Sequence, residues 1–183
     1  MKKIKYPIDK HDWHPSLIPG LIVLISSYNS EKESNIAPKS WLQMVSFEPP
    51  ILMFSGTEGN TTEKNIIESN CFGVNFVDSS KASKVFDCIQ WFGKERIEQT
   101  GFTMIRARKI NAPLIQECKA HLECRLLSTI KVGSGFVIFG EIVAASIWEE
   151  ILRVEHEKRY ELLDPIVFLE DGMYSRINNT SKV

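Results

Sequence analysis

The stretch Asn35-Ile36-Ala37-Pro38-Lys39-Ser40 decides how the chain is interpreted, because it places polar residues and a proline between two apolar runs. Ala37 would let a flat ligand approach the backbone, and Pro38 fixes φ. Asn35 and Ser40 offer hydrogen-bond donors and acceptors without charge. These residue types make a poor core strand, so we expect a polar lip beside a strand. A polar turn between two strands is the alternative that the stretch alone would favour.

The length and composition are those of one soluble globular domain. We expect this domain to span 1–183, with an N-terminal arm at 1–19 and a C-terminal extension at 149–183. Hydrophobic residues make up 43% of the chain and charged residues 25%, which is ordinary for a globular protein. The formal net charge of -1 gives no overall field that would attract nucleic acid or an acidic membrane. We therefore expect neither as a partner.

The cysteines and the N-terminus indicate a reducing compartment. No C-x-x-C pair occurs among the four cysteines, which are Cys71, Cys88, Cys118 and Cys124. Without a secretory signal, we expect them to be buried thiols and not a disulfide framework. The longest apolar run, 21–25, is far too short to span a bilayer. The sequence therefore predicts a cytoplasmic protein.

Two histidines near the N-terminus, His11 and His14, flank Asp12-Trp13. A metal site would need further ligands, and the sequence does not supply them at a recognisable spacing. We therefore expect no metal, and interpret this segment as a surface arm that docks through Trp13.

Short apolar segments separated by polar turns indicate a mainly β protein. The predicted strands are 21–25, 44–47, 51–55, 72–77, 121–127 and 136–148, with a hairpin turn at Gly133-Ser134-Gly135. A helix is predicted at 63–68 after a cap at Asn60 or a threonine, a second at 79–89 from a serine cap, and 149–161 is expected to be helical in part. This pattern predicts a β-barrel with helical insertions and not an alternating parallel sheet.

The common catalytic and nucleotide-binding motifs do not occur in the sequence. No G-x-G-x-x-G follows a strand, and no Walker lysine motif, G-x-S-x-G elbow or H-E-x-x-H is present. Cys124 lies in an alternating segment and is interpreted as a core residue. Catalytic residues cannot be assigned by spacing, which leaves a soluble β-barrel with a possible ligand lip.

Seven segments, taken together, resemble the FMN-binding split-barrel family of flavin reductase-like proteins, which includes flavoredoxin. In order along 20–147 they are Asn35-Ile36-Ala37-Pro38-Lys39-Ser40, Val45-Ser46-Phe47-Glu48-Pro49-Pro50, Thr62-Glu63-Lys64-Asn65-Ile66, Phe72-Gly73-Val74-Asn75, Thr100-Gly101-Phe102-Thr103, Ala112-Pro113-Leu114-Ile115-Gln116-Glu117 and Leu122-Glu123-Cys124. The resemblance implies a Greek-key antiparallel split barrel. It also implies a homodimer with FMN, or FAD as the alternative, held near the subunit interface.

The resemblance implies a set of cofactor-binding residues as well. Those expected along the flavin and its ribityl chain are Asn35, Ile36, Ala37, Pro38 and Ser40, and those expected toward the phosphate are Ser55, Thr62, Lys64 and Asn65. Such a ring needs a flat apolar wall with a few edge hydrogen bonds. A phosphate needs helix-terminal N–H groups, hydroxyls and a cation. We expect Ser40 and Asn65 on the lip of the barrel and not in its core.

The chemistry implied by the resemblance is hydride transfer from NAD(P)H to the flavin, in which no side-chain acid or base is needed. The first hypothesis is therefore an FMN-dependent oxidoreductase that reduces flavin or another acceptor. Many reductases of the family carry Gly-x-His in the hairpin before the last long strand, where this chain has Gly133-Ser134-Gly135-Phe136. That difference favours the alternative of an FMN electron carrier that takes electrons from a redox partner protein. A third hypothesis is a barrel that binds haem or another ligand in place of flavin.

Overall fold

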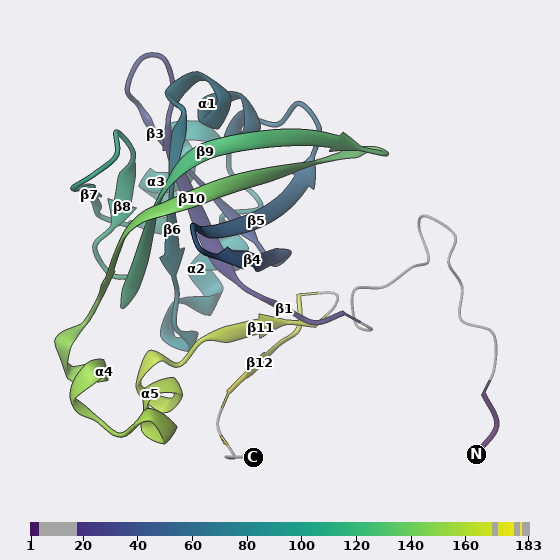
Figure 1. Cartoon of the computed structure of the whole chain (residues 1–183), viewed down its shortest axis with the longest axis vertical. Helices are drawn as coiled ribbons and strands as arrows, with labels where there is room; N and C mark the ends of the chain where they lie inside the picture. The colour runs from purple at the N-terminus through teal and green to yellow at the C-terminus, as the bar shows by residue number, and fades with distance from the viewer. Residues whose placement is uncertain (4–17, 170–171, 178–179, 181–183) are drawn as a thin grey trace.

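A computed structural model of the chain describes residues 1–3, 18–169, 172–177 and 180 (Figure 1). Seven antiparallel strands form its main sheet: β2 (Val23–Tyr28), β3 (Ser34–Lys39), β4 (Leu42–Phe47), β5 (Pro50–Thr57), β6 (Cys71–Phe76), β9 (Ala120–Val132) and β10 (Gly135–Ile147). Their order across the sheet is β3-β2-β6-β9-β10-β5-β4. Each of the six predicted strands falls on a strand of this sheet, and the predicted turn joins β9 to β10.

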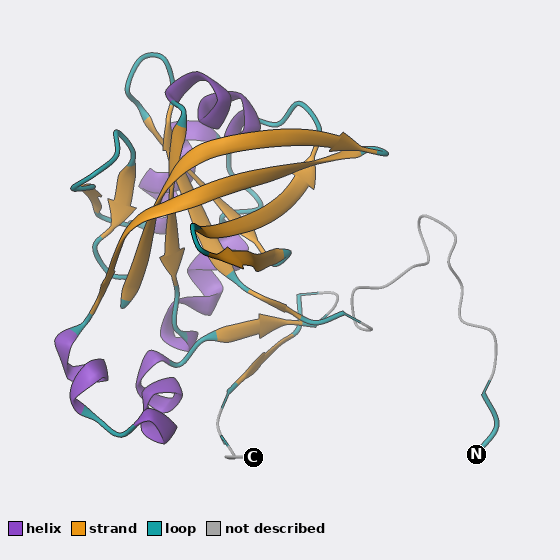
Figure 2. Cartoon of the chain, viewed as in Figure 1, coloured by secondary structure: helices purple, strands orange, loops and turns teal. Residues whose placement is uncertain are grey.

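The sheet curves strongly, as the long bent strands β9 and β10 show in Figure 2, and its edge strand β3 comes close to β5. The edge strands β3 and β4 are consecutive in the chain, and only Ser40 and Trp41 separate them. The N–H of Ser55 donates to the carbonyl oxygen of Trp41 at 3.2 Å, which continues the β4–β5 ladder beyond its Leu42–Phe54 pair. The prediction of a mainly β, antiparallel barrel with helical insertions is therefore confirmed. We call the place where β3 meets β5, at residues 39–41 and 55–56, the seam.

Residues 35–39 of this stretch belong to strand β3, so the prediction of a polar lip or turn was wrong for them; only Ser40 lies outside the strand, in the link to β4. Asn35, Ile36 and Ala37 are buried within β3, which pairs with β2 from Ser34 to Lys39. Pro38 is tolerated because β3 is an edge strand, where a missing N–H breaks no central ladder. The backbone of β3 is also covered on its other side, since Arg96 donates from its guanidinium to the Ile36 carbonyl.

Apolar side chains fill the inside of the barrel. The buried members are Val23, Ile25, Leu52, Phe54, Ile66, Phe72, Val74, Cys124, Phe136 and Ile138. Phe54 lies at their centre, with its ring edge-on to Phe72 at 5.3 Å and to Phe136 at 6.4 Å between centroids. Gly140 leaves room for the Phe72 ring, because a Cβ at that position would overlap it.

A second apolar cluster lies outside the barrel, between β2 and β3 and the helices behind them. It joins Ile22, Leu24 and Ile36 to α2 (Ala82–Asp87), α3 (Gly93–Thr100) and neighbouring loops. The short ribbon β7 (Met104–Arg106) and β8 (Pro113–Ile115) follows α3. The predicted helix at 79–89 is divided, since 79–81 form a 3₁₀ turn whose cap is Asp78 and not a serine. The helix α3 was not predicted.

Helix α1 (Thr61–Ser69) closes one end of the barrel, at the top of Figure 1. The predicted cap at Asn60 is confirmed, because its side-chain oxygen accepts from the N–H of Glu63 at 3.0 Å. Within the described ranges, no helix is both long and apolar enough to cross a lipid bilayer.

The last part of the chain packs against the opposite end. Helices α4 (Glu149–Arg153) and α5 (His156–Leu163) lead into β11 (Ile166–Phe168) and β12 (Tyr174–Arg176). These strands form a small sheet with β1 (Gly20–Leu21) in the order β1-β11-β12. The prediction that 149–161 is helical in part is confirmed, because α4 and α5 lie over 149–163.

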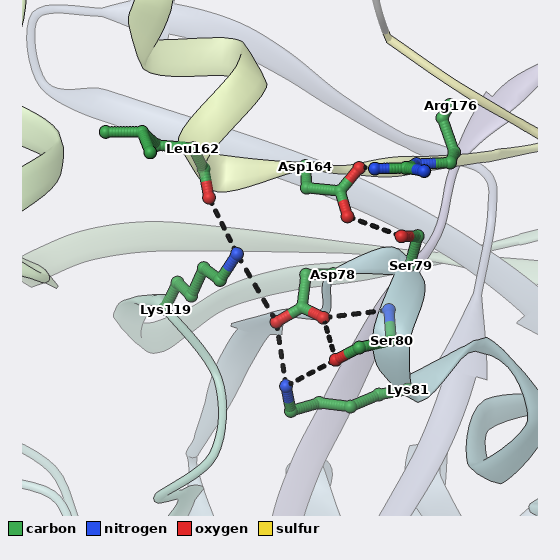
Figure 3. Close-up of polar contacts among 8 residues, drawn as sticks. All are labelled: Asp78, Ser79, Ser80, Lys81, Lys119, Leu162, Asp164 and Arg176. Atoms are coloured by element: carbon green, nitrogen blue, oxygen red, sulfur yellow. Dashed lines mark hydrogen bonds and ion pairs between the residues drawn. The ribbon is translucent and has the colours of Figure 1, made fainter.

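Figure 3 shows the polar contacts that hold this C-terminal segment in place. Asp78 is buried and lies 2.8 Å from the Nζ of Lys81 and 3.6 Å from that of Lys119. Lys119 also donates to the carbonyl of Leu162 at 2.6 Å. Asp164 accepts from the hydroxyl of Ser79 and from Arg176, the latter at 2.8 Å. The start of α2, the start of β9 and the end of α5 are thereby tied together.

The carboxylate of Asp78 carries the central charge of these contacts. Burial alone would raise its pKa, but the hydrogen bonds from Lys81 and Ser80 and the charge of Lys119 outweigh burial and hold the pKa below its usual range. A carboxylate with a lowered pKa contributes its full stabilisation above the pKa of the unfolded chain. That contribution is lost as the pH falls through the pKa of the folded state.

Replacing Asp78 by Asn should lower the free energy of unfolding at pH 7 by about 1–3 kcal/mol, because two partly buried lysines would lose their counter-charge. The difference from wild type should begin to shrink below about pH 4, where the carboxylate of the unfolded chain protonates, and fall further as the pH approaches the lowered pKa of the folded state. Urea unfolding at pH 7 and pH 3, at one protein concentration, measures both. Glu149→Gln is the control, since its pair with Arg153 is exposed. If wild type and Asp78→Asn differ in free energy of unfolding by the same amount at the two pH values, the stabilising role of the Asp78 charge is contradicted.

Candidate functional site

A long groove runs beside the seam and has a volume of about 750 Å³. Its walls come from the segment before β2, from β4 and β5, and from single positions on β6, β9 and β10. The lining residues are Ile18, Pro19, Gly20, Leu21, Ser40, Trp41, Leu42, Gln43, Met44, Leu52, Met53, Phe54, Ser55, Phe76, Leu122 and Val137. Ser40 and Ser55 supply hydroxyls to a wall that is otherwise almost wholly apolar. Two of the predicted cofactor-binding residues therefore meet in this groove.

A smaller hollow of about 190 Å³ lies on the other side of Ser40. Pro38, Lys39 and Ser40 form one wall, and the opposite wall includes Phe86 of α2 and Phe168 of β11. Ser40 lines both spaces. The predicted residue Pro38 is thus placed next to the groove, with its ring toward helix α2.

Three other predicted residues lie in a buried polar cluster beneath α1. The side-chain amide of Asn35 donates to the hydroxyl of Thr62 at 3.2 Å, and that of Asn65 donates to the hydroxyl of Ser27 at 3.4 Å. All four side chains are buried, and Asn65 is only 4% exposed. Asn65 was expected on the lip, so its position is a correction. These contacts attach α1 to β2 and β3, because each joins the helix to one of the two strands.

The remaining predicted residues differ in exposure. Ile36 is part of the outer apolar cluster and Ala37 is nearly buried, so their side chains offer little surface to a ligand. Lys64 is exposed on α1. The start of α1 is occupied by the chain itself, since the Glu63 carboxylate accepts from the N–H of Gly59 at 2.6 Å in addition to the Asn60 cap. A negative side chain there opposes the attraction of a helix N-terminus for phosphate.

Two cations beside β3 were not assigned a role from the sequence. Arg96 on α3 donates from Nε to the carbonyl of Trp91 at 2.8 Å and from its terminal nitrogen to that of Ile36. Lys39 lies at the seam, where a Cβ on Gly56 would be 2.8 Å from its Nζ. Lys39 stood within the quoted stretch, but its surroundings depend on β5 and α3, which local sequence does not reveal.

Outside the groove, the cysteines are held as protonated thiols, and both ring nitrogens of His121 have hydrogen-bond partners. The four cysteines are free and buried, as predicted, and burial raises the pKa of Cys88 to about 11. Burial also lowers the pKa of His121, whose nitrogens contact the Ile115 carbonyl at 2.8 Å and the Ser146 hydroxyl at 3.2 Å. Across the described part of the chain, no three potential metal ligands gather. The expected arm at 1–19, with His11, Trp13 and His14, lies mainly outside the described residues.

Comparison with known proteins identifies the family. A model of the flavin reductase like domain matches residues 16–173. An uncharacterized protein of Aquifex aeolicus is 32% identical over 157 residues, which cover 82% of this chain and 80% of that protein. The chain therefore belongs to the flavin reductase like domain family, and the resemblance inferred from the seven segments is confirmed.

Solved structures extend this comparison to the whole fold. The 2-nitrobenzoate 2-nitroreductase NbaA of Pseudomonas fluorescens has a TM-score of 0.80 and 31% identity, covering 90% of this chain and 83% of that one. Component B of the nitrilotriacetate monooxygenase of Bacillus cereus has a TM-score of 0.88 at 23% identity, covering 100% and 98%. An FMN-binding protein of Thermus thermophilus has a TM-score of 0.78 at 16% identity, covering 100% and 98%. The last two show the shared split-barrel fold.

The groove has the size and the mostly apolar lining that suit a flat ring such as that of a flavin. Pockets for ligands of this size have volumes of roughly 300–1,000 Å³ and are mostly apolar with a few polar groups. The groove lies within that range, and the hydroxyls of Ser40 and Ser55 are its polar contacts on the two sides of the seam. The residues present therefore fit a flavin.

Replacing Thr62 by Val should lower the free energy of unfolding of the flavin-free protein by about 1–3 kcal/mol, because the buried amide of Asn35 would lose its acceptor. Thr61→Val, at the exposed neighbouring position, should change it by less than about 0.5 kcal/mol. Thr62→Ser keeps the hydroxyl and should recover most of the loss. Urea unfolding measures all three, and equal effects at positions 61 and 62 would rule out the assigned hydrogen bond.

Proposed function

We propose that the protein is an FMN-dependent oxidoreductase that uses NAD(P)H to reduce flavin or another acceptor. The observation that carries the proposal is the groove at the seam, where an apolar wall and two hydroxyls meet in a chain of the flavin reductase like domain family. Relatives of known activity in this family include reductases, such as the 2-nitrobenzoate 2-nitroreductase, which supports a reductive activity here.

The side chains of the groove have separate roles in this proposal. Trp41, Leu42 and Phe54 exclude water from the ring of the cofactor and give it an apolar surface. Ser40 and Ser55 bind its polar edge or its ribityl chain by hydrogen bonds. Lys64 remains a candidate for the phosphate, and the buried Asn35, Thr62 and Asn65 act by fixing α1 against the barrel. FMN, when bound, supplies the hydride chemistry, so the protein needs only to bind and orient the reactants.

A second copy of the chain is part of the proposal. Strand β4 is an edge of the main sheet, and its Val45 and Phe47 are exposed, as is Trp41 just before it, with Phe47 89% exposed. Exposed edge strands with large apolar side chains favour association. A homodimer would cover these side chains and shield the open side of the groove.

Sedimentation velocity should find a dimer for the wild type and a monomer for Phe47→Glu, because a buried charge would oppose the contact. The variant should keep its far-ultraviolet circular dichroism spectrum, since Phe47 lies outside both apolar clusters. A wild-type monomer at micromolar concentration would overturn the homodimer.

The flavin and nicotinamide parts of the proposal are tested together by absorption spectroscopy under nitrogen. Purified protein incubated with FMN should retain a flavin band through gel filtration, and NADH or NADPH should bleach it. The variant with Ser40→Ala and Ser55→Ala should bind FMN about tenfold more weakly, because two hydrogen bonds are lost. Ser175→Ala, an exposed serine on β12, is the matched control and should bind as wild type. A wild-type protein that retains no FMN would overturn the proposal.

An electron carrier is the second candidate, and one observation favours it. The turn between β9 and β10 is formed by Gly133 and Ser134 and carries no imidazole. In that case the bound flavin would bleach with a reduced partner protein but with neither nicotinamide nucleotide. The same spectra therefore distinguish the two functions.

A further inference from the structure

Another cavity lies between β9, β10 and the ribbon of β7 and β8 (Figure 1), and its volume is about 220 Å³. On β9, Leu122 lines the groove at the seam, whereas His121 and Glu123 line this cavity. Successive side chains of a strand point to opposite faces of a sheet. The cavity is therefore on the outer face, with the sheet between it and the groove, and we call it the outer pocket.

A buried carboxylate fixes the loop at the edge of the outer pocket. Glu123 is only 3% exposed, and its side-chain oxygens accept from the backbone N–H of Arg108 at 3.1 Å and from that of Lys109 at 2.6 Å. A buried carboxylate needs such hydrogen bonds, because it has lost its contacts with water. The backbone of the loop after β7 is thereby held against β9.

This loop presents two guanidinium groups to the outer pocket. Arg106 and Arg108 both line it, while Ala107 between them is buried. The two arginines thus lie on the same side of the chain, two positions apart. A guanidinium offers planar sets of N–H donors that match the geometry of a carboxylate, and here the backbone that carries both groups is fixed.

Other polar groups of the outer pocket are used within the protein. The Nε2 of His121 lies 2.8 Å from the carbonyl oxygen of Ile115, so it carries the hydrogen, and Nδ1 accepts from the hydroxyl of Ser146 at 3.2 Å. Burial lowers the pKa of His121, which keeps the ring neutral at pH 7. The Nζ of Lys119 donates to the carbonyl of Leu162 at 2.6 Å. The charge of a ligand would therefore be bound by the two arginines.

Apolar side chains complete the lining of the outer pocket. Ile105, Ile147 and Trp148 contribute to it and are 37%, 37% and 42% exposed. Apolar surface beside two cations favours a ligand that has an apolar body and an anionic group. The volume is below the roughly 300–1,000 Å³ of pockets for drug-sized ligands, which favours a molecule of about one ring.

We propose that the outer pocket binds a small organic carboxylate, with its carboxylate on Arg106 and Arg108 and its apolar part against Trp148. Each guanidinium can donate charge-assisted hydrogen bonds to the carboxylate oxygens. Because the main sheet separates the outer pocket from the groove, this binding requires no flavin.

The test uses benzoate as the probe and isothermal titration calorimetry at low salt. Benzoate should bind with a dissociation constant below about 5 mM, and benzamide, which has the same ring without the charge, at least about tenfold more weakly. Arg106→Gln and Arg108→Gln, both at exposed positions, should each weaken benzoate binding by about five- to tenfold.

Lys109→Gln is the matched control for these variants. It removes a positive charge from the same loop at an exposed position that does not line the outer pocket, so benzoate affinity should stay within about twofold of wild type. Trp148→Phe keeps an aromatic surface and should keep the affinity, but it should lose the change in tryptophan fluorescence that benzoate causes in the wild type.

FMN distinguishes the outer pocket from the groove. Benzoate should bind equally well with and without saturating FMN, because the two sites lie on opposite faces of the sheet. Competition between benzoate and FMN would place benzoate in the groove and overturn the proposal. So would an absence of benzoate binding, equal affinities for benzoate and benzamide, or equal losses in Arg106→Gln and Lys109→Gln. If wild type retains no FMN, the proposed function fails, while the comparison of variants still decides the role of the outer pocket.

Discussion

Closure of the main sheet is the constraint on which the rest of the structure depends. The edge strands β3 and β4 are joined by only Ser40 and Trp41, so the chain itself brings the two edges of the sheet together. Strand β5, which pairs with β4, comes against the end of β3, where a Cβ on Gly56 would lie 2.8 Å from the Nζ of Lys39. Closure encloses Phe54, Phe72 and Phe136, and burial of such side chains is the main favourable contribution to folding. The groove runs beside this closure, since Ser40 in the β3–β4 link and Ser55 on β5 both line it.

The parts of the fold that the sequence predicted are those determined by local pattern. In the hairpin of β9 and β10 the start of β9 alternates polar and apolar residues, β10 is almost continuously apolar, and the turn carries glycines. The cap of α1 needs only Asn60 and the residues after it. Strand β3 was missed because distant residues stabilise it. Its partner β2 pairs on one side, and Arg96, 60 positions along the chain from Ile36, covers a carbonyl on the other. The composition of a polar segment does not indicate which distant residues will pair with it or cover its backbone.

The candidate site divides in a similar way. Family resemblance selected a set of residues that do converge near the seam and α1, but it could not separate those that line the groove from those that attach the helix. Ser40 and Ser55 belong to the first group, and Thr62 and Asn65 to the second. The burial of Lys39 and its closeness to Arg96 could not be predicted, because both depend on three-dimensional neighbours. For this reason a lysine in a polar stretch looks ordinary in the sequence.

The small sheet β1-β11-β12 ties formation of the groove to the order in which the chain is synthesised. Residues 18–21 line the groove, and Gly20 packs so closely on the Ser40 carbonyl that no side chain would fit. This wall is held by β11, since Gly20 pairs with Phe168 and Leu21 with Val167. The wall formed by residues 18–21 therefore gains its pairing partner only when a strand nearly 150 residues later in the chain has been made. A nascent chain can form the β9–β10 hairpin before that point, but this wall of the groove is completed only after residue 168 has emerged, so the groove is finished late in folding.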